Sequence, residues 1–579
     1  MNDAFSMPAT ATPDVCTFAL LVDGLDVSGQ FHVLSLEVSR ELNRIPCAVI
    51  VLSDGEAAKS TFQASDTEHF IPGRKIEIQL GYRAKNERVF KGVIVKHSIR
   101  VRKSASQLIV ECRDDAVRMC QETNTRHYSG KTDSEIIEEL ISAHGLEHQV
   151  QSSGAVLGDL VQYNASDWDF MLCRAEANGQ VVVVDDGSIK VMRPATSTEP
   201  VVSIHYGATL IELDAEIDAR WQSKSIHTSS WSAVEQKIIV AEANESAVVS
   251  SGNLTPDHLA GVTGSDARVL RHGGGLGQSE LQAWADGRLL KERLAKVRGR
   301  ARCQGFASAK PGNMLMLNGV GRRFEGKLFV AGVRHLVVNG NWETDVQLGL
   351  SPQQFASAHD LRPMPAAGLL PAVSGLQIGV VTALQGDPAH EERIAVQLPF
   401  VGNSTQGVWA RVACLDAGKQ RGTFFRPEIG DEVVVGFLDS DPRHPVVLGM
   451  CHSSARPAPE PAADSNDLKG YVSREKLRLL FDDDSKSARL ETPAGNRITL
   501  SEDAKGIVIA DQNGNKITLD ANGVCIESNK DLILKATNDI KLQGVNLDLK
   551  ASMALKANSS DAELSGANVV IKGGLIRIN

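Results

Sequence analysis

The stretch GNRITLSEDAKGIVIAD (495–511) is echoed by GNKITLDANGVCIESN (514–529), so the pattern GN-x-ITL recurs at a spacing of nineteen residues. The period then shortens to eight in DLILKATN (531–538) and DIKLQGVN (539–546), and shorter units continue to the end of VVIKGGLIRIN (569–579). Each unit has apolar residues at positions i and i+2 followed by a small-residue turn, which indicates a short β-strand. A short, fixed period predicts stacked identical units rather than a globular domain.

Such units cannot be stable in isolation, because each carries two or three aliphatic side chains and no aromatic residue follows Phe481. Ordering the backbone costs roughly 1–2 kcal/mol per residue, which exceeds the gain from so little burial. A single-chain solenoid with rungs of about twenty residues, or several chains sharing one core, would supply the missing burial. Eight-residue units are too short to close a single-chain coil. We therefore predict a trimeric, intertwined β-helix over residues 468–579, with Lys and Asp alternating on its outer face. The predicted trimer core consists of Leu532, Leu534, Ile540, Leu542, Leu547 and Leu549.

The chain before this repeat divides at two proline-rich segments with a linker composition, residues 359–373 and 453–467. Between them, residues 374–452 contain four or five short strands, which suits a small closed barrel of the OB type. Residues 1–358 are predicted to form a hub domain of β-barrels with inserted helices. The predicted fold class is mainly β.

Three helices are predicted in the hub domain. Thr132 and Glu135 form a capping box before the first helix, and Ser166 repeats this device before the second. A hairpin around Asp186-Gly187 is expected next. The third helix is predicted over residues 279–300, because apolar side chains recur there at i, i+4 and i+7.

Composition excludes several protein classes. With 579 residues, 42% of them hydrophobic and 23% charged, the chain is not disordered and has room for roughly four domains. Its apolar stretches are too short or too interrupted to cross a bilayer. The net charge of −10 gives no support to a nucleic-acid partner. The nine cysteines are scattered without a CxxC pair, which predicts free thiols in a reducing compartment. The N-terminal residues show no secretory signal pattern.

Motifs for phosphate or metal binding are incomplete. GRRFEGKL (321–328) has Leu where a phosphate-binding loop needs Ser or Thr, and it leads into a strand, so a hairpin is predicted. HGGGLG (272–277) is expected to be a loop. His390-Glu391-Glu392 lacks a second metal ligand and is expected to be a turn. His144 and His148 have the spacing of metal ligands on one helix face, but Gly145 is expected to end that helix, which predicts surface histidines.

Two further stretches and three aromatic residues also have the residue types of a binding site. DQNGNKITLD (511–520) resembles the start of a calcium loop but has Lys where that loop needs Gly, so a turn is predicted. Asp482–Asp484 is predicted to be a solvated charge run. Phe424, Phe425 and Trp409 could stack on a ligand of the barrel, although we expect them in its core.

The most basic segment is the end of the third predicted helix. Its cations are better explained by the helix macrodipole than by nucleic-acid binding, because only Trp284 could interleave with them. The cations are Arg288, Lys291, Arg293, Lys296, Arg298, Arg300 and Arg302.

Four stretches in order resemble VgrG-type spike proteins of contractile injection systems. VQYNASDWDFMLCRAEANGQVVVV (161–184) resembles the family signature, and KPGNMLMLNGVGRRFEGKLFVAGVRHLVV (310–338) its hub. The segment 408–449, with GTFFRPEIGDEVVVGFLDSDPRHPVVLG, resembles its OB-fold, and the octads resemble phage needles. This resemblance implies a homotrimer in which the hub carries the tail tube, the OB-fold is a collar and the β-helix pierces the target envelope to deliver effectors.

The same resemblance implies tail tube and baseplate proteins as partners, with effector cargo and transient contact with a target membrane. It implies assembly in the bacterial cytoplasm and then a place in an extracellular or secreted particle. No enzymatic activity, cofactor, metal or nucleic acid is expected. Many type VI members have extra blocks between OB-fold and needle or effector domains after it. This chain is expected to have neither, which favours an extracellular tail-like particle slightly over type VI secretion.

The C-terminal tip is predicted to bind a separate protein. No histidine follows His452 to hold a tip metal, and the family implies a PAAR-repeat cap. The predicted tip-binding residues are Gly573, Gly574, Leu575, Ile576, Ile578 and Asn579. Two rival functions remain open: a spike with cell-wall hydrolase activity, for which residues 453–467 leave little room, and an OB-fold binder of oligosaccharide or nucleic acid.

Overall fold

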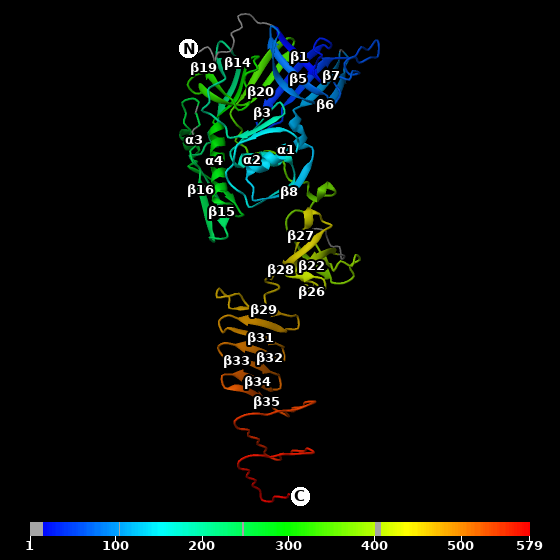
Figure 1. Cartoon of the computed structure of the whole chain (residues 1–579), viewed down its shortest axis with the longest axis vertical. Coiled ribbons are helices and arrows are strands. Elements are labelled where there is room, and N and C mark those ends of the chain that lie inside the picture. Colours follow the sequence, from blue (N-terminus) through cyan, green and yellow to red (C-terminus); the bar gives the residue numbers. More distant parts are fainter. Residues whose placement is uncertain (1–14, 104, 246–247, 250, 400–406, 579) are drawn as a thin grey trace. The chain divides into compact units, whose positions relative to one another are not determined.

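The computed structural model describes residues 15–103, 105–245, 248–249, 251–399 and 407–578 (Figure 1). The chain divides into two compact units, the first ending at Ala372 and the second beginning at Val373. The fold class is confirmed as mainly β, with a small closed barrel in the second unit. In the described part of the chain, no helix combines the length and apolar character that a membrane crossing requires.

One large sheet dominates the first unit. Its main path runs β14-β18-β21-β20-β3-β4-β7-β6-β5-β1-β2, and β13 joins it through β19, which pairs with β20. The bounds are β1 (Cys16–Val22), β2 (Leu25–Asp26), β3 (Val33–Glu41), β4 (Cys47–Ser53), β5 (Lys75–Tyr82), β6 (Lys85–Val101), β7 (Ser106–Arg113), β13 (Val202–His205), β14 (Leu210–Ile217), β18 (Val297–Gln304), β19 (Met314–Asn318), β20 (Gly326–Val338) and β21 (Asn341–Leu348).

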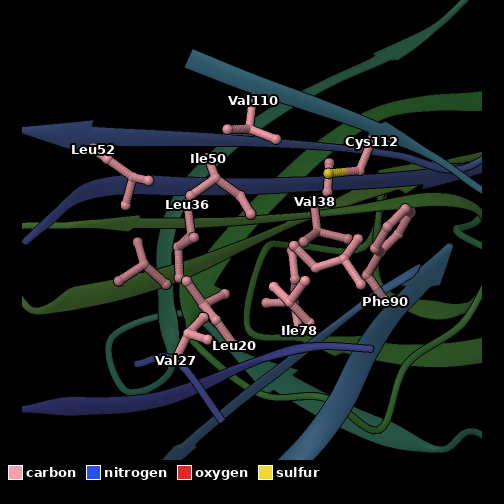
Figure 2. Close-up of a cluster of buried hydrophobic side chains, with 14 of the residues drawn as sticks. Leu20, Val27, Leu36, Val38, Ile50, Leu52, Ile78, Phe90, Val110 and Cys112 are labelled. Carbon is pink, nitrogen blue, oxygen red and sulfur yellow. The ribbon is translucent and has the colours of Figure 1, made fainter. Parts of the chain in front are cut away.

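The large sheet encloses two separate cores. The first is built from alternating inward residues of the N-terminal strands; Leu20, Ile50, Ile78 and Phe90 converge in it and are almost fully buried (Figure 2). The second lies among β13, β18, β19, β20 and β21. Alternation of buried and half-buried residues along β3, β4 and β7 explains why the sequence specifies strands here.

A helical segment lies between the N-terminal and C-terminal strands of this sheet. Its elements are β8 (Thr123–Ser129), α1 (Asp133–Ser142), β9 (Glu147–Val150), β10 (Asp159–Ser166), α2 (Asp167–Ala177), β11 (Val181–Asp185) and β12 (Ser188–Met192). The capping box of Thr132 and Glu135 is confirmed, and Ser166 caps α2. The hairpin turn at Asp186-Gly187 also forms, with positive φ at both residues.

A second insertion consists of a small sheet and two helices. Its elements are β15 (Ser225–Ser232), β16 (Lys237–Glu242), α3 (Pro256–Thr263), β17 (Ala267–His272) and α4 (Gln278–Leu294). The predicted helix over 279–300 is too long, because α4 ends at Leu294 and Val297 begins β18. Ala301 and Cys303 of β18 are buried between outward arginines, and this period of two favours a strand. A short helix, α5 (Phe355–Ala358), follows β21.

The contact between α2 and α4 depends on two glycines. Gly179, with φ +66°, follows α2 and lies against Gly287 in the middle of α4. A Cβ built on Gly287 would lie 2.7 Å from the Gly179 nitrogen, a distance that real Cβ atoms do not show. Neither glycine can therefore carry a side chain unless the helices separate.

Gly287→Ala should lower the stability of the hub, although alanine has the higher helix propensity by about 1 kcal/mol. We expect a net loss of about 1–3 kcal/mol from the overpacking, measured as a lower midpoint of thermal unfolding. Gly261→Ala in α3 is the matched control, because nothing lies within 4 Å of its Cβ position. Equal midpoints for the two variants would show that the close contact does not constrain the fold.

The second unit begins with a closed five-stranded barrel of order β22-β23-β24-β28-β27. Its strands are β22 (Gln377–Ala383), β23 (Ile394–Gln397), β24 (Val408–Val412), β27 (Glu432–Phe437) and β28 (Pro445–Met450), with a hairpin of β25 (Ala417–Gly418) and β26 (Arg421–Gly422). The barrel core contains Val381, Val396, Val433 and Val447. Strands of this length and number match the OB-type barrel predicted from sequence.

Seven antiparallel strands follow the barrel and pair strictly in chain order (Figure 1). They are β29 (Leu468–Val472), β30 (Arg478–Asp482), β31 (Ser487–Glu491), β32 (Arg497–Ser501), β33 (Gly506–Ala510), β34 (Lys516–Asp520) and β35 (Gly523–Glu527). Residues 528–578, which contain the octads, carry no strand within a single chain.

Candidate functional site

Two rows of apolar side chains run along one face of the sheet β30–β35. In each row, the residues are direct cross-strand partners from one strand to the next. The first row is Leu479, Leu490, Ile498, Ile509, Ile517 and Ile526. The second row is Phe481, Ala488, Leu500, Ile507, Leu519 and Val524. Residues two apart on a strand share a face, so both rows lie on the same side of the sheet.

These rows have no covering layer within the described chain. Ala488 and Ile517 are half-buried and the other members of the two rows are 37–65% exposed, whereas the hub core is almost fully buried. An open apolar hollow of about 690 Å³ is lined by most of the first row together with Leu477 and Leu532. The opposite face is mixed, because Arg489 and Thr499 lie in one cross-strand row with Leu480 and Val508. An apolar face of this extent marks an interaction surface.

The repeated asparagine of GN-x-ITL connects successive turns of the sheet. Asn496 Oδ1 accepts a hydrogen bond from the Gln512 backbone N–H at 3.2 Å. Its counterpart nineteen residues later, Asn515, accepts from the Asn529 N–H at 3.1 Å. Asp511 holds the turn itself, because its carboxylate accepts hydrogen bonds from the Asn515 side chain at 2.7 Å and from the backbone N–H groups of Asn515 and Asn513. The same hydrogen bonds lower the pKa of Asp511 to about 2. The stretch 511–520 therefore begins with a turn, as predicted.

The predicted trimer core lies in the octads that follow. Leu532, Leu534, Ile540, Leu542, Leu547 and Leu549 are 53–62% exposed in the single chain. Their burial between chains stays a prediction. The two rows at residues 479–526 were missed as interface residues, although the same i, i+2 alternation in RITL, GIVIA and KITL could have identified them.

The predicted tip residues are solvent-accessible. Leu575 is 74% exposed, Ile576 49% and Ile578 86%. Gly573 and Gly574 precede them without a strand, and Asn579 lies outside the described residues. Their role in binding a partner stays a prediction.

The candidate metal residues lie apart. Among the described residues, no group of three or more His, Cys, Asp or Glu side chains could hold a metal ion. Gly145 follows α1 with φ +66°, and His148 is exposed on β9, whereas His144 is half-buried and contacts Asp167 at 2.9 Å. Burial raises the pKa of Asp167, but hydrogen bonds from Gln162, His144 and Asn124 hold it below its usual value. Through His144 and Asp167, this cluster joins the end of α1 to the start of α2.

The remaining loop motifs have the predicted conformations. Residues 321–325 form the turn between β19 and β20, with Phe324 N–H donating to the Gly321 carbonyl at 3.1 Å. Residues 273–277 form the loop before α4. His390 and Glu392 lie in a turn with positive φ. Asp482 accepts a hydrogen bond from the Ser485 backbone N–H at 3.2 Å in the turn after β30.

The basic residues around α4 and on β18 have partners within the hub. Arg288 pairs with Glu292, Lys291 with Glu176 and Arg293 with Glu245. Lys296 donates to the carbonyl oxygens of Ser251 and Leu254. On β18, the arginines pair with acids of neighbouring strands: Arg298 with Glu216, Arg300 with Asp214 and Arg302 with Asp345. These contacts favour the structural interpretation over nucleic-acid binding.

The expected core position of the barrel aromatics is wrong. Phe424 is 84% exposed and Phe425 56%, because both follow β26 in a loop outside the barrel wall. Trp409 is half-buried on β24 between Val408 and Ala410, which pack in the barrel core, so its side chain lies on the other face of the strand. The free thiols are confirmed for all nine cysteines.

A large β-rich hub, a closed OB-type barrel and a sheet with one uncovered apolar face together define the class of baseplate spike proteins. Three family models match successive parts of the chain. The Alg8 N-terminal domain matches residues 12–339. The type VI secretion system/phage-baseplate injector OB domain matches residues 377–452, and the phage baseplate V C-terminal trimerisation domain matches residues 487–579.

Curated relatives and solved structures of the same kind are similar to this chain. The type VI secretion system spike protein VgrG1b of Pseudomonas aeruginosa is 29% identical over 38% of this chain and 29% of its own length. VgrG1c of the same organism is 29% identical over 31% of this chain and 24% of its own length. The chain thus spans less than a third of the length of these two relatives.

Two solved structures have low similarity to this chain. The tail protein from Neisseria meningitidis MC58 has a TM-score of 0.44 and 14% identity, over 59% of this chain and 99% of that one. The E. coli c3393 protein, described as a component of the type VI secretion system, has a TM-score of 0.37 and 14% identity, over 75% of this chain and 99% of that one. The chain belongs to the Alg8 N-terminal domain family, whose model matches more than half of its length. The two baseplate domain models and the curated relatives identify it as a VgrG-type spike protein.

Proposed function

We propose that this spike protein is a homotrimer that links the tail tube to the tip of a contractile injection system. In this role, it punctures the target cell envelope and delivers effectors. The observation that carries the proposal is the pair of uncovered apolar rows at residues 479–526, within a region largely matched by a trimerisation domain. Three copies would cover each other's rows and bury them about a shared axis. Sedimentation of the full-length protein tests this, because a stable monomer would contradict the proposal.

The proposed role is mechanical and non-enzymatic. The chain would supply a stiff needle, and the contracting sheath would supply the work. Only residues 453–467 connect the barrel to the needle, and a domain needs at least ~50 residues. A murein-hydrolysis assay of the purified trimer decides between this role and the cell-wall hydrolase alternative. Turnover of murein would contradict the non-enzymatic role.

We assign the spike to an extracellular tail-like particle, and we prefer this assignment slightly over a type VI system. The short connection between barrel and needle supports this preference, since many type VI members carry extra blocks there. The proposal includes assembly in the bacterial cytoplasm and later presence in the released particle. Genes for a membrane-anchoring complex beside this one would contradict the preference, and genes for a free particle would support it.

The tip is proposed to bind a PAAR-repeat protein through Gly573–Asn579. The exposed Leu575 and Ile578 would form a small apolar platform with three-fold symmetry. Deleting residues 573–579 should abolish pull-down of the cognate PAAR protein by the intact trimer, because the platform is lost. Undiminished binding after the deletion would contradict this assignment, as would one metal ion per three chains in the trimer alone.

A further inference from the structure

The outer wall of the barrel carries an apolar patch in addition to the barrel core. The wall patch consists of Leu376, Ile378, Val380, Val434 and Leu448. It extends across β22, β27 and β28, which are hydrogen-bonded neighbours. Ile378 and Val434 are direct cross-strand partners, and Val380 lies two residues from Ile378 on the same face.

Gly436 allows the leucines of this patch to approach each other. A Cβ on Gly436 would lie 3.2 Å from Leu448 Cδ1 and 3.5 Å from Leu376 Cδ2. Both leucines therefore cover the same bare backbone position, although Leu376 remains 64% exposed and Leu448 51%. The barrel interior is already filled by its own valines, so the apolar side chains of the wall patch do not contribute to the barrel core.

A second apolar surface lies on the loop that connects β24 to β27. This loop patch consists of Leu415, Phe424, Phe425 and Ile429, which are 56–95% exposed. It contacts the start of the needle: the Phe425 ring lies 4.7 Å from the Tyr471 ring, and Glu428 pairs with Arg474 at 2.8 Å. The loop patch is therefore continuous with the needle, whose uncovered rows begin at Leu479.

Three-fold symmetry requires two different complementary surfaces on each copy. In a ring of identical subunits, one patch of each copy contacts a different patch of the next, unlike the self-complementary contact of a two-fold dimer. The barrel presents two such patches on separate elements. From this pairing and its continuity with the needle, we infer that the loop patch of one copy docks on the wall patch of the next copy, with Phe424 as the central anchor.

This inference rests on the proposed trimeric function and extends the shared interface into the barrel. The three barrels would form a closed collar, because the three-fold rotation that relates the needle chains would relate the barrels as well. Aromatic residues are the side chains that most often anchor such contacts. Phe424, which is 84% exposed and has no ring contact among the described residues, fits this role.

Photo-crosslinking in the full-length protein tests this docking. With p-benzoylphenylalanine at position 424, irradiation should join separate chains, with attachment at residues 376–380 or 445–450 of another copy. The same group at Val234, which is 95% exposed in the hub, should give no product at those segments. Leu448→Lys combined with the photoreactive residue should cause loss of the inter-chain product, because it places a charge in the wall patch.

The outcomes separate this inference from the proposed function. A trimer by sedimentation whose crosslinks lie only within one chain, reach residues 1–372, or are missing would overturn the docking and leave the trimer intact. A monomer by sedimentation would overturn both. An unchanged inter-chain product in the Leu448→Lys protein would also overturn the assignment of the wall patch.

Discussion

Ile498→Asp should prevent trimer assembly. Ile498 lies in the middle of the first apolar row, between Leu490 and Ile509. Three-fold symmetry would bring three carboxylates together in one layer of the shared core. Burying an unpaired charge costs several kcal/mol per ion, which exceeds what one layer of aliphatic contacts returns. Sedimentation of the full-length variant should show monomers where the unchanged protein shows trimers.

Thr499→Asp is the matched control for this substitution. Thr499 is the next residue on β32, its side chain points to the opposite face, and its cross-strand neighbour is Arg489. The trimer should persist in this variant. In the octads, Leu534→Asp should abolish assembly and Lys535→Asp should be tolerated for the same reason. Equal effects within either pair would show that the inner and outer faces are wrongly assigned.

Arg40→Met should reduce the free energy of unfolding of the hub by about 3–5 kcal/mol. Arg40 is 5% exposed, donates to the Val89 carbonyl at 3.2 Å, and pairs with Asp185 and Asp186 of the β11–β12 hairpin. Although burial raises the pKa of Asp185, Lys310 and Arg40 hold it below its usual value. Removal of the guanidinium leaves Asp185 with Lys310 and Asp186 with Arg88 as their remaining cationic partners in a partly buried site. Urea unfolding followed by tryptophan fluorescence measures this, because five of the six tryptophans lie in the hub.

Arg44→Met provides the comparison for Arg40. Arg44 pairs with Glu41 at 3.1 Å, and both side chains are well exposed. Exposed ion pairs contribute about 0–1 kcal/mol, so this variant should unfold almost like the unchanged protein. A similar loss in both variants would mean that the buried cluster has no special role in attaching the hairpin to the sheet.

Local signals in the sequence were sufficient to predict several elements of the fold. The capping box at Thr132 identifies the start of α1, and Asp186-Gly187 identifies a hairpin, because both depend on a few adjacent residues. The end of α4 was missed, since its basic residues continue without a break into β18. There, pairing with β14 and β21 decides the conformation, and no local residue pattern reveals such a distant partner.

The candidate site was only partly predictable for a similar reason. The octads were recognised from their period, but the rows from Leu479 to Ile526 become continuous only when the register of successive strands is known. The exposure of Phe424 was also not predictable, because aromatic residues beside a barrel strand are more often buried in its core. The tip residues and the octad core have no partner within one chain, so their contacts depend on the assembly.

The most direct test of the trimeric spike is the mass of the full-length protein in solution. Sedimentation equilibrium should give three chains of 62.2 kDa, about 187 kDa, without dissociation on dilution, because the apolar rows are covered only in the trimer. A stable monomer of 62.2 kDa with the same rows exposed would contradict the account.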